Sequence, residues 1–368
     1  MHILSSLCKL AFVLAVFGTL TSLAAGQDAK SQIKAEIDRL ATSLKEKPIT
    51  DPDYASLGSM ASQSLQGAAA ALDSGKLYAS LEMLLQAGDF LQGARFPVEK
   101  AEAVKSGLPA FEAEWEKVSQ ILTACDREVR IKDWGPSTAA VRALSETALG
   151  RSVPLLEGGR GFAVSTKPSD GLFYLGQAQG EAAFAKFSST LSLPRNAAAF
   201  PLRSYLPELQ KLQQKTNAAF KPPRSIELHP RFIALNSALK LAEELDAQKF
   251  YAGALYQYLE ATRHFGMLDA PPVGVARQSA LKDAIAATLK KITASKQDDS
   301  IAQLFLERAQ SQIVHSDGSA TTADEWRSAQ VILDQVLSDY RTAQKPPAPL
   351  QLASGKTVDL TLVRWPYT

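Results

Sequence analysis

The sequence predicts an all-α protein in which helical hairpins pack as an irregular solenoid or a bundle, with a short C-terminal extended arm or strand. Apolar residues recur at intervals of three and four along most of the chain, which is the period of an amphipathic helix. The alternating pattern of a strand is confined to the last residues. The only cysteines are Cys8 and Cys125, so we expect a hydrophobic core, not disulfides, to hold the fold.

Residues 1–26 have the pattern of a secretory signal peptide. Lys9 precedes an apolar run over residues 10–20, and small residues occupy positions 24–26. A basic residue, a short apolar segment and a small-residue cleavage site are the three parts of such a signal. We therefore expect a secreted or periplasmic protein that starts near Gln27 and has no stable membrane span after cleavage. An uncleaved anchor is the alternative, because the apolar character continues almost to the end of this segment.

An N-terminal helical region is predicted over residues 27–150. The apolar stripe from Ile33 to Leu44 belongs to its first helix, which Pro48 ends. Pro109 opens a later helix whose stripe runs from Phe111 to Cys125. The helices expected in this region span residues 33–44, 54–72, 76–91, 109–125 and 138–149.

A connection over residues 151–170 is expected to separate this region from a second helical region over 171–345. The connection holds Pro154, Gly158, Gly159, Gly161 and Pro168. Because glycine and proline interrupt regular structure, we expect it to be irregular, as we do the proline-containing segment 220–230. Helices of the second region are expected over residues 171–191, 204–220, 230–245, 249–265, 275–294, 300–314 and 323–342.

A Pro-rich and extended tail, residues 346–368, is predicted at the end. The prolines at 346, 347 and 349 detach it from the last helix. Val358, Leu360 and Leu362 alternate with polar residues, as in an edge strand or an extended arm. Such a strand either packs back on its own helices or adds to the sheet of a partner.

Two segments share a helix–turn–helix pattern. Seven of the sixteen residues from Ser64 to Ala79 recur in residues 237–252, including a Leu-Asp pair before the turn and a Tyr-Ala pair after it. The second segment has large, small and aromatic residues in the order of a tetratricopeptide helical hairpin, at Leu241, Ala242, Leu245, Tyr251, Ala254, Tyr258 and Ala261. Residues 241–261 therefore resemble one unit of that family, and residues 64–87 resemble a weaker one. The resemblance implies stacked hairpins that form a binding or scaffolding surface.

The charge of the chain is almost balanced. The formal net charge is +2, and it falls to +1 without Lys9. The sequence shows no basic stripe interleaved with aromatic residues, which argues against nucleic acid as a partner. Charges of both signs are scattered along the predicted helices, which is typical of solvated helix faces.

The residues that could act as nucleophiles or metal ligands do not form a recognisable site. Cys125 lies on an apolar stripe, where we expect a buried side chain and not a nucleophile. His229, His264 and His315 are not at metal-ligand spacing on one helix.

Short motifs of known enzymes are also incomplete. Residues 237–240 and 279–282 both read Ser-Ala-Leu-Lys, but the companion motifs of serine acyltransferases are missing. Residues 355–357 read Gly-Lys-Thr without the first glycine of a phosphate loop. We therefore predict no catalytic, cofactor-binding or metal-ligating residue, and no cofactor.

These observations predict an exported, non-enzymatic helical scaffold or binding protein of the bacterial envelope, which mediates protein–protein interaction with another envelope or secreted protein. The alternative is an all-helical enzyme acting on envelope polymers or glycans. That alternative requires a pocket that collects His, Arg, Tyr and carboxylates from distant helices. A third hypothesis, carriage of a small ligand between helices, requires a dry apolar cavity.

Overall fold

The computed structural model describes residues 28–135, 138–193, 197–314 and 320–345, together with the backbone of two short C-terminal strands. The all-α prediction is confirmed. The first part of the chain forms α2 (Ala29–Glu46), α3 (Ala55–Asp73), α4 (Leu77–Lys100), α5 (Leu108–Ile131), α6 (Ala139–Ser165), the 3-10 turn η1 (Pro168–Gly171) and α7 (Leu172–Thr190). The second part forms α8 (Leu206–Ala219), α9 (Arg224–Glu227), α10 (His229–Ala247), α11 (Tyr251–Asp269), α12 (Val275–Thr293), α13 (Ser300–Ile313), α14 (Ala323–Val331), the π-helical turn η2 (Ile332–Val336) and α15 (Leu337–Ala343).

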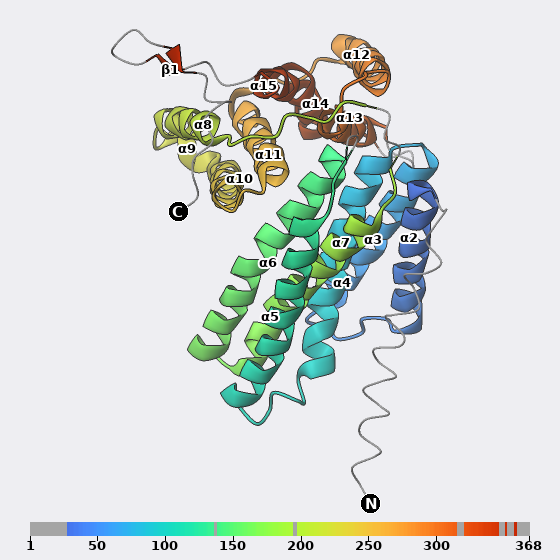
Figure 1. The fold of residues 1–368 in the computed structure, drawn as a ribbon, viewed down its shortest axis with the longest axis vertical. Helices are drawn as coiled ribbons and strands as arrows, with labels where there is room; N and C mark the ends of the chain where they lie inside the picture. Colours follow the sequence, from blue (N-terminus) through green and yellow to red (C-terminus); the bar gives the residue numbers. More distant parts are fainter. Residues whose placement is uncertain are drawn as a thin grey trace, which may run out of the picture.

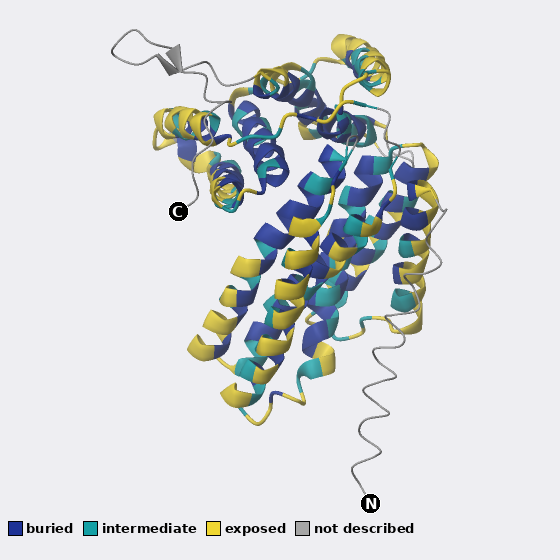
Figure 2. Ribbon diagram, in the orientation of Figure 1, coloured by how far each residue is buried: buried dark blue, intermediate teal, exposed yellow. Residues whose placement is uncertain are grey.

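The helices form a long bundle with a helical layer across one end. Figure 1 shows α2 to α7 side by side in the bundle, and α8 to α15 gathered over its upper end. Helix α7 packs against α4, α5 and α6, so it lies at the centre of the bundle. Buried residues concentrate on the helix faces that meet one another, while exposed residues cover the outer faces (Figure 2). This is the distribution expected for amphipathic helices around a hydrophobic core.

Two short strands represent the predicted C-terminal arm. β1 (Leu350–Gln351) pairs antiparallel with β2 (Thr357–Val358), and Leu350 lies opposite Val358. The rest of the tail, including Leu360 and Leu362, lies outside the described residues, as does the predicted signal peptide over residues 1–26. Among the helices that the structure describes, none combines the length and the apolar character needed to cross a membrane.

The prediction of an irregular connection over residues 151–170 is wrong for most of its length. Helix α6 continues without interruption to Ser165, with Pro154 inside it. The reason is burial: Leu156, Gly159 and Ala163 lie on the face of α6 that is buried in the bundle. This tertiary packing outweighs the low helix propensity of glycine and proline. Only the segment around η1 is a turn.

Helix α4 also extends beyond its predicted end at residue 91, because the added residues are packed in the bundle. The helix runs to Lys100, with Gly93, Ala94 and Phe96 buried and Pro97 inside it. The segment 220–230 does connect two helices, as expected, and it contains the one-turn helix α9 before α10 begins at His229.

Glycines of α7 let its backbone approach that of α4 closely. A Cβ atom added to Gly176 would lie 2.3 Å from the carbonyl oxygen of Gln92, and one added to Gly180 would lie 2.9 Å from that of Gly88. Real Cβ atoms do not come this close to a backbone oxygen. The absence of side chains at these two positions therefore sets the separation of the two central helices.

The two segments that share a sequence pattern form two hairpins with similar turns. Helix α3 packs on α4, and α10 packs on α11. In the first turn the N–H of Lys76 donates to the carbonyl of Ala71 at 2.8 Å, and in the second the N–H of Phe250 donates to that of Leu245 at 2.9 Å. Each turn has one residue with positive φ, Gly75 in the first and Lys249 in the second. Both are Schellman-type helix ends.

Acidic side chains from distant parts of the chain cap three helix N-termini. The Glu307 carboxylate, on α13, accepts hydrogen bonds from the N–H groups of Tyr78 at 2.8 Å and Ala79 at 3.0 Å, in the first turn of α4. The Glu146 carboxylate, on α6, accepts one from the N–H of Gly253, in the first turn of α11, at 2.8 Å. The Asp298 carboxylate, just before α13, accepts the N–H of Ala139 at the start of α6 at 2.9 Å. These bonds satisfy N–H groups that a helix cannot pair by itself, and they join the bundle to the layer.

Two glycine substitutions test this packing. We expect Gly176→Ala to destabilise the protein by about 1–3 kcal/mol, because the new methyl group overlaps the backbone of α4. We expect Gly158→Ala to stabilise it by about 0.5–1 kcal/mol, because a Cβ there meets no atom within 4 Å and alanine favours the helix. Chemical denaturation measures both. Equal destabilisation by both changes would contradict the helical assignment of Gly158.

Candidate functional site

Two hollows lie on either side of α10. The first is a cleft of about 780 Å³, lined in part by charged side chains, between the end of the bundle, at α4 and α6, and the layer helices α10, α11 and α13. The second is an apolar groove of about 660 Å³ along α8 and α10. Ser237 lines both. Both volumes fall within the range of about 300–1,000 Å³ that is typical of ligand sites.

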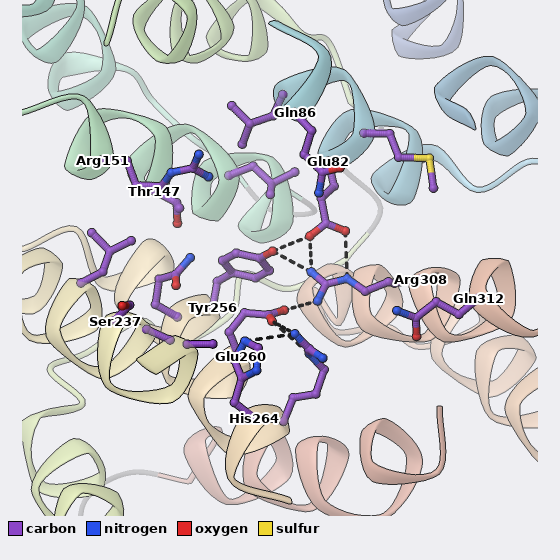
Figure 3. Close-up of a pocket in the computed structure, with 18 of the residues that line it drawn as sticks. Glu82, Gln86, Thr147, Arg151, Ser237, Tyr256, Glu260, His264, Arg308 and Gln312 are labelled. Atoms are coloured by element: carbon purple, nitrogen blue, oxygen red, sulfur yellow. Dashed lines mark hydrogen bonds and ion pairs between the residues drawn. The ribbon is translucent and has the colours of Figure 1, made fainter. Parts of the chain in front are cut away.

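Arg308 holds together the charged groups of the cleft (Figure 3). Its Nε donates to Glu82 Oε2 at 2.9 Å, its Nη2 pairs with the other oxygen of Glu82, and its Nη1 pairs with Glu260. The hydroxyl of Tyr256 donates to Glu82 Oε1 at 2.6 Å and accepts from Arg308 Nη2 at 2.7 Å. One guanidinium on α13 thus bridges α4 and α11. Because these side chains are largely buried, each charge depends on its partner.

The second part of the network lies within α11. Arg263 Nε donates to Glu260 Oε2 at 3.0 Å, and Arg263 Nη2 lies 3.2 Å from His264 Nε2. A guanidinium has no acceptor, so His264 Nε2 accepts this bond and the imidazole is neutral. Burial lowers the pKa of His264 to about 4, with the charge of Arg263 acting in the same direction.

The pKa values of Glu260 and Tyr256, the acidic and phenolic groups discussed next, also lie far from neutral pH. Burial acts to raise the pKa of Glu260, but Arg308 and Arg263 outweigh it and lower this pKa to about 2. Burial raises the pKa of Tyr256 well above its ordinary value. At neutral pH the network therefore consists of ionised Glu260, neutral His264 and neutral Tyr256.

A second cation, Arg151 of α6, lies on the other side of the cleft. Its Nη2 donates to Asp89 Oδ2 at 2.9 Å and lies 2.6 Å from Glu181 Oε1. Burial raises the pKa of Asp89 to about 6, although Arg151 opposes this. Burial also raises the pKa of Glu181 well above its usual range. Arg151 is thus paired with both carboxyl groups, and these partners raise the pKa of its guanidinium above the ordinary value.

The groove on the other side of α10 exposes aromatic and aliphatic side chains. Phe220 is 42% exposed and Ile233 is 54% exposed. The ring of Phe220 packs edge-on against that of Phe232, with the centroids 5.0 Å apart. Large exposed apolar side chains that share a groove are typical of interaction sites.

The structure places the residues singled out by sequence in separate environments. Cys125 is buried in α5, where its Sγ lies 3.3 Å from the carbonyl oxygen of Ala182, and burial raises the pKa of the thiol to about 12. His229 lines the groove, His264 lies in the cleft, and His315 is outside the described residues. Within the parts of the chain that the structure describes, no group of three or more His, Cys, Asp or Glu side chains is placed to hold a metal ion.

The Ser-Ala-Leu-Lys tetrads are also placed apart. Ser237 lines both hollows and Lys240 lines the groove. Lys282, from the other tetrad, lies over the ring of Trp326, with its Nζ 5.4 Å from the ring centroid.

Of the cleft residues, only His264 and Ser237 could be singled out from the sequence for their chemistry. Glu82, Tyr256 and Arg308 come from three helices, and up to 226 residues separate them. One signal was present: Glu307 and Arg308 directly follow the apolar run of residues 304–306 in α13, and charges beside such a run are often paired inside a protein.

Comparisons with protein-family models, with curated proteins and with solved structures give no match to this chain.

Arg308→Ala tests whether the cleft depends on one guanidinium. We expect a loss of about 3–5 kcal/mol in unfolding free energy, because Glu82 and Glu260 would be left buried with fewer partners. The matched control is Arg39→Ala, which removes an exposed pair with Glu36 and should cost less than about 1 kcal/mol. Denaturant unfolding measures both, and similar losses would contradict the role given to Arg308.

The lowered pKa of His264 predicts that the protein loses stability as the pH falls. Its folded pKa of about 4 lies below the ordinary value of 6.5, so the unfolded state gains its proton first as pH falls. This contribution to stability is present above pH 6.5 and is lost between pH 6.5 and pH 4. We expect His264→Gln to lose less stability than the wild type between pH 7 and pH 4.5 in urea unfolding. Identical pH profiles would show that the imidazole does not titrate in this way.

Proposed function

We propose that this protein is an exported, non-enzymatic helical binding protein of the bacterial envelope, which mediates protein–protein interaction. The observation that carries the proposal is the exposed apolar groove on α8 and α10, beside a cleft whose charges are already paired with one another. The signal-peptide pattern over residues 1–26 supports export. The helical hairpins, which we propose to be tetratricopeptide-like, support a role as a binding surface.

The state of the cleft groups favours binding over proton transfer. A general acid or base works best with a pKa near the operating pH. His264, at about 4, and Glu260, at about 2, are displaced below neutrality, and the pKa of Tyr256 is displaced far above it. Each of the three is also hydrogen-bonded to another member of the network.

The groove fits an apolar segment of another envelope or secreted protein. Phe220 and Ile233 present apolar surface, while Lys240 and Asn236 supply polar groups along the same groove. An apolar centre with polar groups at its edge is typical of protein interfaces. Aromatic side chains such as Phe220 contribute much of the binding energy in such interfaces.

Ile233→Asp tests the groove. We expect the tagged mature protein to capture a stoichiometric partner from the envelope fraction of the organism that encodes it, and Ile233→Asp to reduce that capture by at least about tenfold, because a charge cannot be buried there without a partner. Val275→Asp is the matched control, since Val275 is 83% exposed on α12, away from the groove. Mass spectrometry quantifies the captured protein. Equal capture by both variants, or no partner at all, would contradict the proposal.

The second candidate function is an all-helical enzyme acting on envelope polymers or glycans. The observation in its favour is that one cleft collects Tyr256, His264, Arg308 and two glutamates from three helices. If envelope polysaccharide is cleaved by the wild type and not by His264→Gln or Tyr256→Phe, this candidate replaces the first.

A further inference from the structure

We propose that the cleft, in addition to the groove, binds a small neutral ligand rich in hydroxyl groups, such as a monosaccharide or disaccharide. The contacts would come from the side of the cleft formed by Thr147, Arg151 and Gln257. This inference is independent of the protein partner proposed above, because it concerns the opposite side of α10.

Two buried polar atoms in the cleft wall have no partner within the described structure. Thr147 is 1% exposed and lines the cleft, and its Oγ1 forms no hydrogen bond. Gln312 Oε1, across the cleft, is also buried without a partner. A buried polar atom without a hydrogen bond destabilises a protein by about 1–3 kcal/mol. A bound ligand that forms hydrogen bonds with these two atoms would remove that cost.

Further hydrogen-bonding capacity lies close to Thr147. Figure 3 shows Arg151 and Thr147 together on the same side of the cleft. Among the residues that the structure describes, Asp89 and Glu181 are the hydrogen-bond and ion-pair partners of Arg151. Both contact its Nη2, which leaves Nε and Nη1 as donors. The amide of Gln257 lines the same cleft and forms no hydrogen bond with the described residues. Hydroxyl and amide groups both donate and accept, as the hydroxyls of a sugar do.

The charge balance of the cleft selects against charged ligands. Arg151, Arg263 and Arg308 line it, and so do Glu82, Glu260 and Glu325. Asp89 adds a further carboxylate behind Arg151. No excess positive charge remains for an anion. Glu82, Glu260 and Asp89 are already bound to arginines, and Glu325 accepts hydrogen bonds from Thr322, so a cation gains little. The groups that remain are neutral donors and acceptors, together with the donors of Arg151.

Saturation-transfer NMR with sugars tests the inference directly. The probes are methyl glucoside, N-acetylglucosamine, cellobiose and chitobiose, with glucuronic acid and glucosamine as charged counterparts. We expect at least one neutral sugar to bind the mature protein with a Kd of about 1 mM or tighter. The charged counterparts should bind roughly tenfold more weakly, because their charge would be desolvated without a partner.

Thr147→Val supplies the site-specific variant, since it keeps the shape of the side chain and removes the hydroxyl. We expect it to weaken sugar binding by roughly tenfold while leaving the protein at least as stable as the wild type. Thr342→Val makes the same change on the exposed face of α15 and should bind as the wild type does. Ile233→Asp should also leave sugar binding unchanged, which separates this inference from the protein partner.

Three results would overturn the inference. They are no binding by any neutral sugar in the panel, equal binding by the charged counterparts, and equal binding by Thr147→Val and Thr342→Val.

Discussion

The architecture depends on carboxylates that cap helix N-termini from distant parts of the chain. Glu307 holds the first turn of α4, Glu146 holds that of α11, and Asp298 holds that of α6. A cap of this kind contributes about 0.5–2 kcal/mol. Burial opposes it, and raises the pKa of Glu307 to about 7 despite the N–H donors of Ala79 and Tyr78. The net contribution of these caps to stability is therefore small. Their main effect is to fix the position of the helical layer relative to the bundle.

The cleft follows from this arrangement. It opens where the end of the bundle meets the layer, and the capped helices α4, α6 and α11 form its walls. Arg308 then ties α13 to α4 and α11 through Glu82 and Glu260. Because buried ion pairs are costly to break and contribute little net stability, their main effect is to define one geometry. A cleft held in one geometry is suited to recognition, since little ordering is lost on binding.

Helices could be predicted from the sequence because the signal is local. The stripe from Ile33 to Leu44 and the proline at 109 mark α2 and α5 within a few residues. The prediction failed for residues 151–170, because Pro154 and Gly159 were judged by propensity, whereas the buried face of α6 decides their structure. The cleft could not be predicted from the sequence for a related reason. Glu82, Tyr256 and Arg308 converge only through the packing of three helices, and no spacing in the sequence indicates that packing.

Amide hydrogen exchange in the native protein tests the role of the caps most directly. The N–H groups of Tyr78, Ala79 and Gly253 lie in the first turns of α4 and α11, where exchange is normally fast. The account predicts that these amides are protected as strongly as amides in the middle of the same helices, because carboxylates of other helices hold them. Fast exchange at these three amides, with protection retained in the helix interiors, would contradict it.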